Sequence, residues 1–251
     1  MSVDILVSEE AGVRYLHFSS DWIQGAMRIA RPWALELEYT REMMACLLLR
    51  PEPRWPRRVL LIGLGAGSLT KFLHRHRPEA RLTVVEIEPA VVAAANFHFK
   101  LPEESARLAV NLGDGADFIA ATKQTFDLIL VDGFDEDARV GELDSLRFYL
   151  NAKAKLSDEG LLVTNLLSKH RDYRDSVARL KEAFDDRALA FPSCSSGNAV
   201  AFAAVGEAVD HTLDELKLHA RLLKTESGLN LLPTLTRLAA SQHCGGGRFT
   251  L

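Results

Sequence analysis

Apolar strand-like runs alternate with helix-like segments from residue 59 to residue 206, and this alternation is the strongest constraint on the fold. The strand-like runs are short, rich in Val, Leu and Ile, and apolar throughout. Strands of this kind are buried on both faces, as in parallel sheets that helices cover on both sides. The predicted strands are 59–64, 81–87, 107–114, 126–134, 160–167, 188–193 and 198–206. We therefore predict an α/β fold with a doubly wound, mainly parallel sheet.

The residues before this alternation have a different pattern. Short alternating runs at 3–31 indicate a small antiparallel β element. Apolar residues at helical spacing follow at 35–49, and a segment rich in proline and charge at 51–58 reads as a linker. We predict two domains, residues 1–52 with the small β element and a helix, and residues 53–251 with the large sheet.

Helices are predicted between the strands and after the last of them. Those within the alternation are 68–76, 90–99, 116–122, 145–155 and 173–184. The end of the chain is predicted to form two further helices, at 211–223 and 229–239. The glycine-rich tail at 244–251 is predicted to be loose.

Composition excludes several classes of protein. With 47% hydrophobic and 25% charged residues, the chain of 251 residues is ordinary for a globular protein. A formal charge of −4 gives no global basic field, so we expect no nucleic-acid partner. Three scattered cysteines fit a reducing compartment and argue against a disulfide framework or a metal site. The start lacks a signal-peptide pattern and no apolar run reaches about 18 residues, so we predict a cytoplasmic protein that binds no membrane.

The first predicted strand of the sheet ends in the glycine loop GLGAGS, residues 63–68. Gly63 and Gly65 allow a tight turn, and Gly67 permits close approach at the start of the next helix. Ligands of open parallel sheets bind outside the carboxyl ends of the strands, so this loop belongs to the predicted site. The loop lacks the third glycine of the GxGxxG dinucleotide pattern, which favours an S-adenosyl donor over NAD.

The next two strands end in carboxylates that suit the rest of a nucleoside. Glu86 follows the glycines by about 20 residues, the spacing at which an acid accepts hydrogen bonds from ribose hydroxyls. Asp114, between two glycines, suits a hydrogen bond from an adenine amino group, or a cap on the following helix. The three strand ends together predict an adenosine pocket.

The fourth strand, in DLILVDGFDED at 127–137, ends in four carboxylates: Asp132, Asp135, Glu136 and Asp137. Asp132 directly follows the apolar run and faces whatever the nucleoside carries beyond its ribose. Asp135 also suits a helix cap, and the two acids after it suit solvated loop positions. A sulfonium donor and an amine acceptor are both cationic, so carboxylates here would hold them and favour loss of the ammonium proton to a base. We interpret the cluster as an amine and sulfonium site.

These motifs resemble those of the spermidine synthase family of aminopropyltransferases. In that family a glycine loop, a VEID-like strand end, a GDG turn and a DSSDP-like turn follow one another at similar intervals. Here they read GLGAGS, VEIEP, GDGAD and DGFDE, and the resemblance extends from about Asp21 to Phe202. It implies a Rossmann-like fold of the S-adenosylmethionine-methyltransferase type and transfer of an aminopropyl group from decarboxylated S-adenosylmethionine to a polyamine or other primary amine. It also implies a homodimer.

The resemblance implies roles for single residues. Asp132 would act on the attacking amine, and Asp135 would hold the acceptor. SDWIQ resembles the family's DGVIQ, and EYTREMM resembles its AYHEMM-like helix start, so Gln24 and Tyr39 are expected to contact the substrates. The residues expected to bind the nucleoside of the donor are Gly63, Gly65, Gly67, Glu86, Ile87, Asp114 and Gly115.

The chain also departs from the family pattern. Ala66 occupies the position of the aspartate that contacts the donor's aminopropyl ammonium in family members, and Arg41 stands where the helix start usually has histidine. Glu136 replaces a proline, and the gate loop at 137–146 lacks the usual GPA. These changes keep two alternatives open, methyl transfer from S-adenosylmethionine and non-catalytic binding of a nucleoside or polyamine. An NAD dehydrogenase is disfavoured because no residue offers a hydride-transfer acid.

Overall fold

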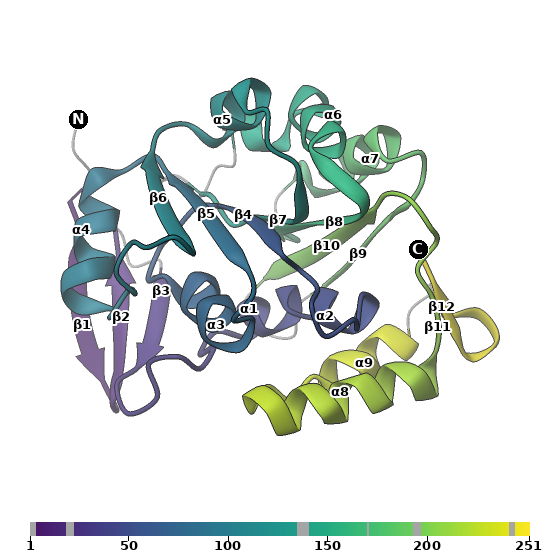
Figure 1. Ribbon diagram of the computed structural model, residues 1–251, viewed down its shortest axis with the longest axis horizontal. Helices are drawn as coiled ribbons and strands as arrows, with labels where there is room; N and C mark the ends of the chain where they lie inside the picture. The colour runs from purple at the N-terminus through teal and green to yellow at the C-terminus, as the bar shows by residue number, and fades with distance from the viewer. Residues whose placement is uncertain (1–3, 19–22, 135–140, 170, 193–196, 241–243) are drawn as a thin grey trace.

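The structure, a computed structural model, describes residues 4–18, 23–134, 141–169, 171–192, 197–240 and 244–251. Within these residues a seven-stranded sheet forms the centre of the molecule, and a three-stranded antiparallel sheet lies at one end (Figure 1). The small sheet consists of β1 (Leu6–Glu10), β2 (Val13–His17) and β3 (Ile23–Arg28). The large sheet consists of β4 (Arg58–Ile62), β5 (Arg81–Glu86), β6 (Leu108–Leu112), β7 (Phe126–Val131), β8 (Leu156–Leu167), β9 (Ala188–Pro192) and β10 (Asn198–Ala204).

The large sheet is mainly parallel and reverses its winding direction at the middle. Its strand order is β6-β5-β4-β7-β8-β10-β9, and β10 alone runs opposite to the other strands, so it is antiparallel to both β8 and β9. The chain adds β5 and β6 on one side of β4 and then places β7 and β8 on the other side. The predicted mainly parallel sheet is confirmed, and its switch point lies between β4 and β7.

Helices cover both faces of the large sheet, so the predicted doubly wound arrangement is also confirmed (Figure 1). One face carries α1 (Glu38–Met43), α2 (Cys46–Leu49), α3 (Ser68–His76), α4 (Pro89–His98), α8 (Leu213–Ser227) and α9 (Leu232–Ala239). The other face carries α5 (Gly115–Ala121), α6 (Leu146–Ala154) and α7 (Tyr173–Ala183). No helix in the described ranges is long and apolar enough to cross a membrane.

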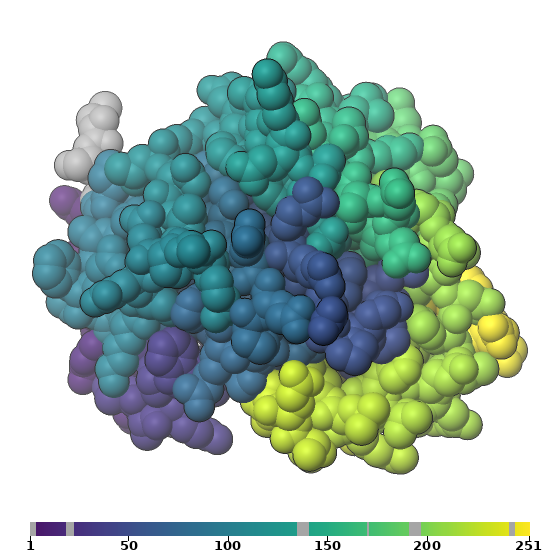
Figure 2. All heavy atoms as spheres, in the orientation of Figure 1, coloured from purple at the N-terminus to yellow at the C-terminus, as the bar shows by residue number. Residues whose placement is uncertain are grey.

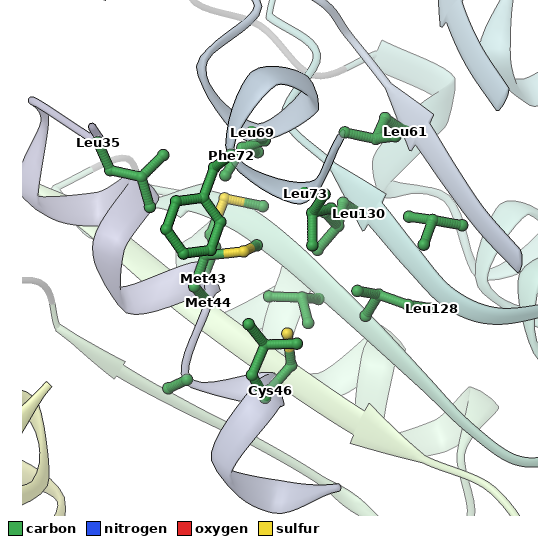
Figure 3. Packing of buried hydrophobic residues seen from close by; sticks show 14 of the residues in the cluster. Leu35, Met43, Met44, Cys46, Leu61, Leu69, Phe72, Leu73, Leu128 and Leu130 are labelled. Carbon is green, nitrogen blue, oxygen red and sulfur yellow. The ribbon is translucent and has the colours of Figure 1, made fainter. Parts of the chain in front are cut away.

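The side chains of β4 show why its apolar run is continuous. Val59 and Leu61 enter the core beneath α1 to α4, whereas Leu60 and Ile62 enter the core beneath α5 to α7. All four are at most 3% exposed. Figure 3 shows the first of these cores, where leucines of β4 and β7 face side chains of α1, α2 and α3. Because both faces of β4 are buried, its sequence is apolar throughout and does not alternate between apolar and polar residues.

The helix predicted over 35–49 is shorter and divided. The helix begins only at Glu38, and the Arg41 guanidinium donates to the carbonyls of Leu35 and Glu36 before it, at 2.8 and 2.7 Å. A tight turn at Met44 and Ala45 then separates α1 from α2. Both short helices are largely buried. Figure 2 shows the yellow-green atoms of α8 and α9 packed against the blue part of the chain, which contains α1 and α2. Tertiary packing here outweighs helical spacing.

The tail predicted to be loose is ordered from Cys244 onward. After a short 3₁₀ turn, β12 (Arg248–Thr250) pairs antiparallel with β11 (Asp210–Thr212). Phe249 is 1% exposed and belongs to the core beneath α9. A buried aromatic between two exposed residues, as in Arg248–Thr250, is a strand pattern. A pattern of three residues was too short to predict a strand after a run of glycines, which favours a loop. The division into residues 1–52 and 53–251 stays a prediction.

Candidate active site

A cavity of about 240 Å³ lies at the carboxyl ends of the strands, across the switch point. The turns after β4, β5, β6 and β7 form its floor, and residues of β3, α1 and the 3₁₀ turn η1 (Gly141–Asp144) complete its wall. Of the residues predicted from the sequence, it is lined by Gln24, Tyr39, Gly63, Gly65, Glu86, Ile87, Asp114, Gly115 and Asp132. Gly67 is not among the lining residues, and Asp135 lies outside the described residues.

Two glycines allow the first turn to pack against its neighbours. Gly63 and Gly65 have φ of +91° and +51°, in the left-handed region that side chains disfavour. A Cβ on Gly63 would lie 2.2 Å from the backbone oxygen of Asp132, and one on Gly65 would lie 2.9 Å from that of Gln24. The glycine loop therefore touches both the β7 turn and β3, and any side chain would push them apart.

Backbone amides hold the carboxylate of Glu86, which is 8% exposed. Its Oε2 accepts a hydrogen bond from the Leu64 amide at 2.8 Å, and its Oε1 accepts one from the Glu88 amide at 3.0 Å. Burial raises the pKa of Glu86, while these amide bonds act in the opposite direction. A carboxylate has more acceptor sites than these amides use, so the group is oriented yet still able to accept a hydrogen bond from a ligand.

Asp114 caps a helix and lines the cavity at the same time. Its Oδ1 accepts from the amides of Ala116 and Asp117, at 2.7 and 3.1 Å, at the start of α5. The cap role that the sequence left open is thus observed. Because both bonds go to Oδ1, the cap does not occupy Oδ2.

Asp132 follows β7 directly and is held from two sides. The Tyr39 hydroxyl of α1 donates to its Oδ2 at 3.1 Å, and the Asn165 side-chain amide of β8 donates to its Oδ1 at 2.8 Å. Burial raises the pKa of Asp132, and the charge of Glu86 raises it further against the effect of the two hydrogen bonds. The pKa of Tyr39 is raised well above its usual value by burial and by Asp132, so the phenol donates its proton. The result is an oriented base whose pKa is higher than that of an ordinary aspartate.

Sequence reasoning missed the side chains behind Asp132. Asn165 is 2% exposed, and its Oδ1 accepts a hydrogen bond from Asn198 Nδ2 of β10 at 2.9 Å. The available signal was an asparagine inside the otherwise apolar run LLVTNLL, because a buried amide needs partners. Its partners, Asp132 and Asn198, are each 33 residues away in the chain, so the sequence around Asn165 does not identify them.

The turn η1 adds Glu142 and Leu143 to the wall of the cavity. Its last residue, Asp144, accepts hydrogen bonds from the Tyr149 hydroxyl at 2.8 Å and the Ser176 hydroxyl at 2.6 Å, and pairs with the Arg179 guanidinium. These contacts fix η1 to α6 and α7. The carboxylate of Glu142 is thus carried at the cavity wall by an anchored turn.

Two of the departures from the family motif, Ala66 and Arg41, have different surroundings, and Glu136 lies outside the described residues. Ala66 lines the cavity and is 2% exposed. It lies close to β3, because a Cβ added to Gly25 would be 2.6 Å from the Cβ of Ala66. The guanidinium of Arg41 instead donates to backbone carbonyls outside the cavity lining. Ala66 is therefore part of the cavity wall, whereas Arg41 stabilises the start of α1. Among the described residues no group of three or more His, Cys, Asp or Glu is arranged to hold a metal ion.

The fold and the position of the cavity place the chain in the class of doubly wound α/β domains with a ligand site at the switch point. Within this class, the model of the spermine/spermidine synthase domain matches residues 37–194. A polyamine aminopropyltransferase of Neisseria meningitidis serogroup B is 34% identical over 248 residues, which cover 99% of this chain and 94% of that protein. The chain therefore belongs to the spermine/spermidine synthase family, as its motifs predicted.

Solved structures of two kinds share the fold. A probable spermidine synthase from Corynebacterium glutamicum has a TM-score of 0.73 at 18% identity, covering 98% of this chain and 91% of that one. Human methyltransferase-like protein 13, solved in complex with SAH, has a TM-score of 0.69 at 26% identity. That match covers 77% of this chain and 93% of the human one. The same architecture thus occurs in structures named for synthase and for methyltransferase activity.

Proposed function

We propose that this protein transfers an aminopropyl group from decarboxylated S-adenosylmethionine to a polyamine or another primary amine. The observation that carries the proposal is the carboxylate of Asp132. It lies at the switch point, in the same cavity as Glu86, and both its oxygens are oriented by neutral donors. The full-length similarity to a polyamine aminopropyltransferase supports the same activity.

The reaction needs a base, because an amine acceptor is an ammonium ion near neutral pH. Asp132 takes one proton from that ammonium, which leaves a neutral amine with a free electron pair. The amine nitrogen attacks the aminopropyl carbon bound to sulfur, so a C–N bond forms while the C–S bond breaks. The electron pair of the broken bond stays on sulfur and converts the sulfonium to the thioether of methylthioadenosine.

The carboxylates also assist this step electrostatically. Both reactants are cations that would repel each other in one cavity, and negative side chains offset that repulsion. We assign Glu86 to the ribose and Asp114 to the adenine, with Ile87 and Gly115 beside them. Gln24 and Tyr39 are assigned to the part of the cavity near the reacting groups, and Asp135 to the acceptor. Holding both reactants in one orientation supplies much of the acceleration by proximity.

Methyl transfer from S-adenosylmethionine is the second candidate, and Ala66 is the observation that favours it. The position has no carboxylate to pair with an aminopropyl ammonium, and it would not repel the carboxylate of an undecarboxylated donor. The fold shared with methyltransferase-like protein 13 is compatible with this reaction.

Product analysis distinguishes these candidates. The protein is incubated with each donor and with putrescine or other primary amines, and the nucleoside products are identified by mass spectrometry. Methylthioadenosine with an aminopropylated amine supports the proposed function. S-adenosylhomocysteine supports methyl transfer, and neither product despite measurable nucleoside binding supports a non-catalytic binder.

We further propose that the protein acts in the cytoplasm as a homodimer. Sedimentation at several protein concentrations tests the dimer, and fractionation of the source cells tests the compartment. A concentration-independent monomer would exclude the dimer.

A further inference from the structure

Asp132 receives one of its two side-chain hydrogen bonds from the strand beside its own. The donor is the side-chain amide of Asn165 on β8, which is 2% exposed and 2.8 Å from Oδ1 of Asp132. An amide has a donor end and an acceptor end. Which end faces the carboxylate decides whether Asp132 meets a proton donor or another oxygen.

The other end of the Asn165 amide contacts Asn198 on β10. Its Nδ2 donates to Oδ1 of Asn165 at 2.9 Å. The antiparallel register pairs Asn165 with Val200, so Asn198 is the diagonal neighbour of Asn165 on the same face of the sheet. Asn198 thus occupies the acceptor end of Asn165 while the donor end faces Asp132, the arrangement that an acceptor-only carboxylate requires.

Resting on the proposed aminopropyl transfer, we propose that Asn165, oriented by Asn198, is a positioning residue that holds the Asp132 carboxylate for the amine. Together with Tyr39 it fixes one bond on each carboxylate oxygen, which opposes rotation of the group. The amide carries no charge. A lysine or arginine in its place would orient the carboxylate as well but would lower its basicity.

Asn198→Asp tests the orientation directly. A carboxylate at 198 accepts but does not donate, so the Asn165 amide is expected to turn its donor end toward β10 and its oxygen toward Asp132. Loss of the donor, together with the added negative charge, raises the pKa of Asp132 by roughly one unit or more. The pKa is measured by NMR of ¹³C-labelled aspartate in the protein without substrates, with Asp132→Asn to assign the signal.

Kinetics provide a second measurement. Asn165→Ala and Asn198→Asp are expected to lower kcat by roughly 10- to 100-fold, with the KM for the donor nearly unchanged, since one hydrogen bond to a charged group is lost. The acid limb of the pH profile moves upward in Asn198→Asp with the NMR pKa. Asn198→Gln keeps an amide donor and recovers activity relative to the aspartate variant.

Asn111→Asp is the matched control. Asn111 lies on β6 outside the cavity lining, and its substitution adds the same charge to the same sheet without touching Asp132. We expect its aspartate pKa and pH profile to match wild type. An equal shift in both variants, or no shift in Asn198→Asp, would overturn the proposal.

Wild-type protein gives a test that depends on no variant. The side-chain amide ¹⁵N signals of Asn165 should titrate with the pKa of Asp132, and an amide signal that ignores this titration would also overturn the proposal. These NMR results do not depend on turnover. A failure of aminopropyl transfer in the product analysis therefore remains distinguishable from a failure of the asparagine pair.

Discussion

At the scale of single residues, Glu86 shows how the backbone prepares a carboxylate for a ligand. Two amides, of Leu64 in the glycine loop and of Glu88, hold its oxygens before any ligand arrives. A ribose that binds there does not have to order the side chain. This lowers the entropic cost of binding.

We predict that Glu86→Ala weakens binding of methylthioadenosine by about 1.5–3 kcal/mol, the scale of hydrogen bonds to a charged group. The measurement is titration calorimetry on the folded variant. Asp117→Ala, which changes an exposed acid at the start of α5, serves as the control. Unchanged affinity in Glu86→Ala would remove this residue from the nucleoside site.

Under the proposed function, the choice of donor depends on Ala66. Ala66 lines the cavity and packs against Gly25 of β3. We predict that Ala66→Asp increases the preference for decarboxylated over full S-adenosylmethionine by roughly 10- to 150-fold, the value of a charge-assisted hydrogen bond. Competitive binding of the two donors measures the ratio. If wild type already prefers the decarboxylated donor by more than about 10³-fold, another residue selects the donor.

At the scale of elements, a buried lysine joins two helices behind the glycine loop. Lys71 of α3 is 1% exposed, and its Nζ donates to the Phe99 carbonyl, at the C-terminal end of α4, at 2.7 Å. Burial lowers the pKa of Lys71 to about 7, and the nearby Lys100 acts in the same direction. The native state therefore releases this proton at lower pH than the unfolded chain does.

The sign of the pH dependence follows from proton binding in the two states. Between about pH 7 and the unfolded lysine pKa of about 10.4, the unfolded chain binds one more proton, so raising the pH stabilises the native state. We predict that Lys71 contributes a slope of at most about 1.4 kcal/mol per pH unit, which Lys71→Met removes. Urea unfolding at pH 7 and pH 9 measures it, with the exposed Lys224→Met as control. Equal slopes in wild type and Lys71→Met would show that this lysine stays charged.

The elements also show which features a sequence can reveal. The core strands were predictable because burial on both faces leaves a continuous apolar run, as in β4. The carboxylates at their ends were predictable because strand ends in a parallel sheet share one edge. The pairing of Asn165 with Asp132 was not, since 33 residues separate them and their contact depends on the neighbouring positions of β7 and β8. The break between α1 and α2 likewise comes from packing against other elements.

At the scale of the whole molecule, the last residues are tied to the core. Val209 and Leu251 exchange backbone hydrogen bonds at 2.9 Å, and Arg248 pairs with Asp210 at 2.7 Å. Phe249 places its ring in the core that α8 and α9 share with α2. The end of the chain thus closes the layer of helices that covers one face of the sheet.

We predict that Phe249→Ala lowers the free energy of unfolding by about 3–5 kcal/mol, the usual cost of removing a buried aromatic ring. Arg248→Ala, which removes only an exposed ion pair, should cost far less, because solvent screens such pairs. Chemical denaturation of both variants gives the comparison. Similar small losses in the two variants would mean that the tail is not part of the cooperative core.

If Asp132 accepts the proton of the attacking amine, Asp132→Asn should abolish this step, because the amide keeps the shape of the side chain and removes the base. We predict that turnover falls by about 10²- to 10⁴-fold while binding of the donor nucleoside is nearly unchanged. In wild type, kcat/KM should fall as the pH drops through the raised pKa of Asp132, at a higher pH than an ordinary aspartate would give. An Asp132→Asn variant that still releases methylthioadenosine at the wild-type rate would contradict the proposed mechanism.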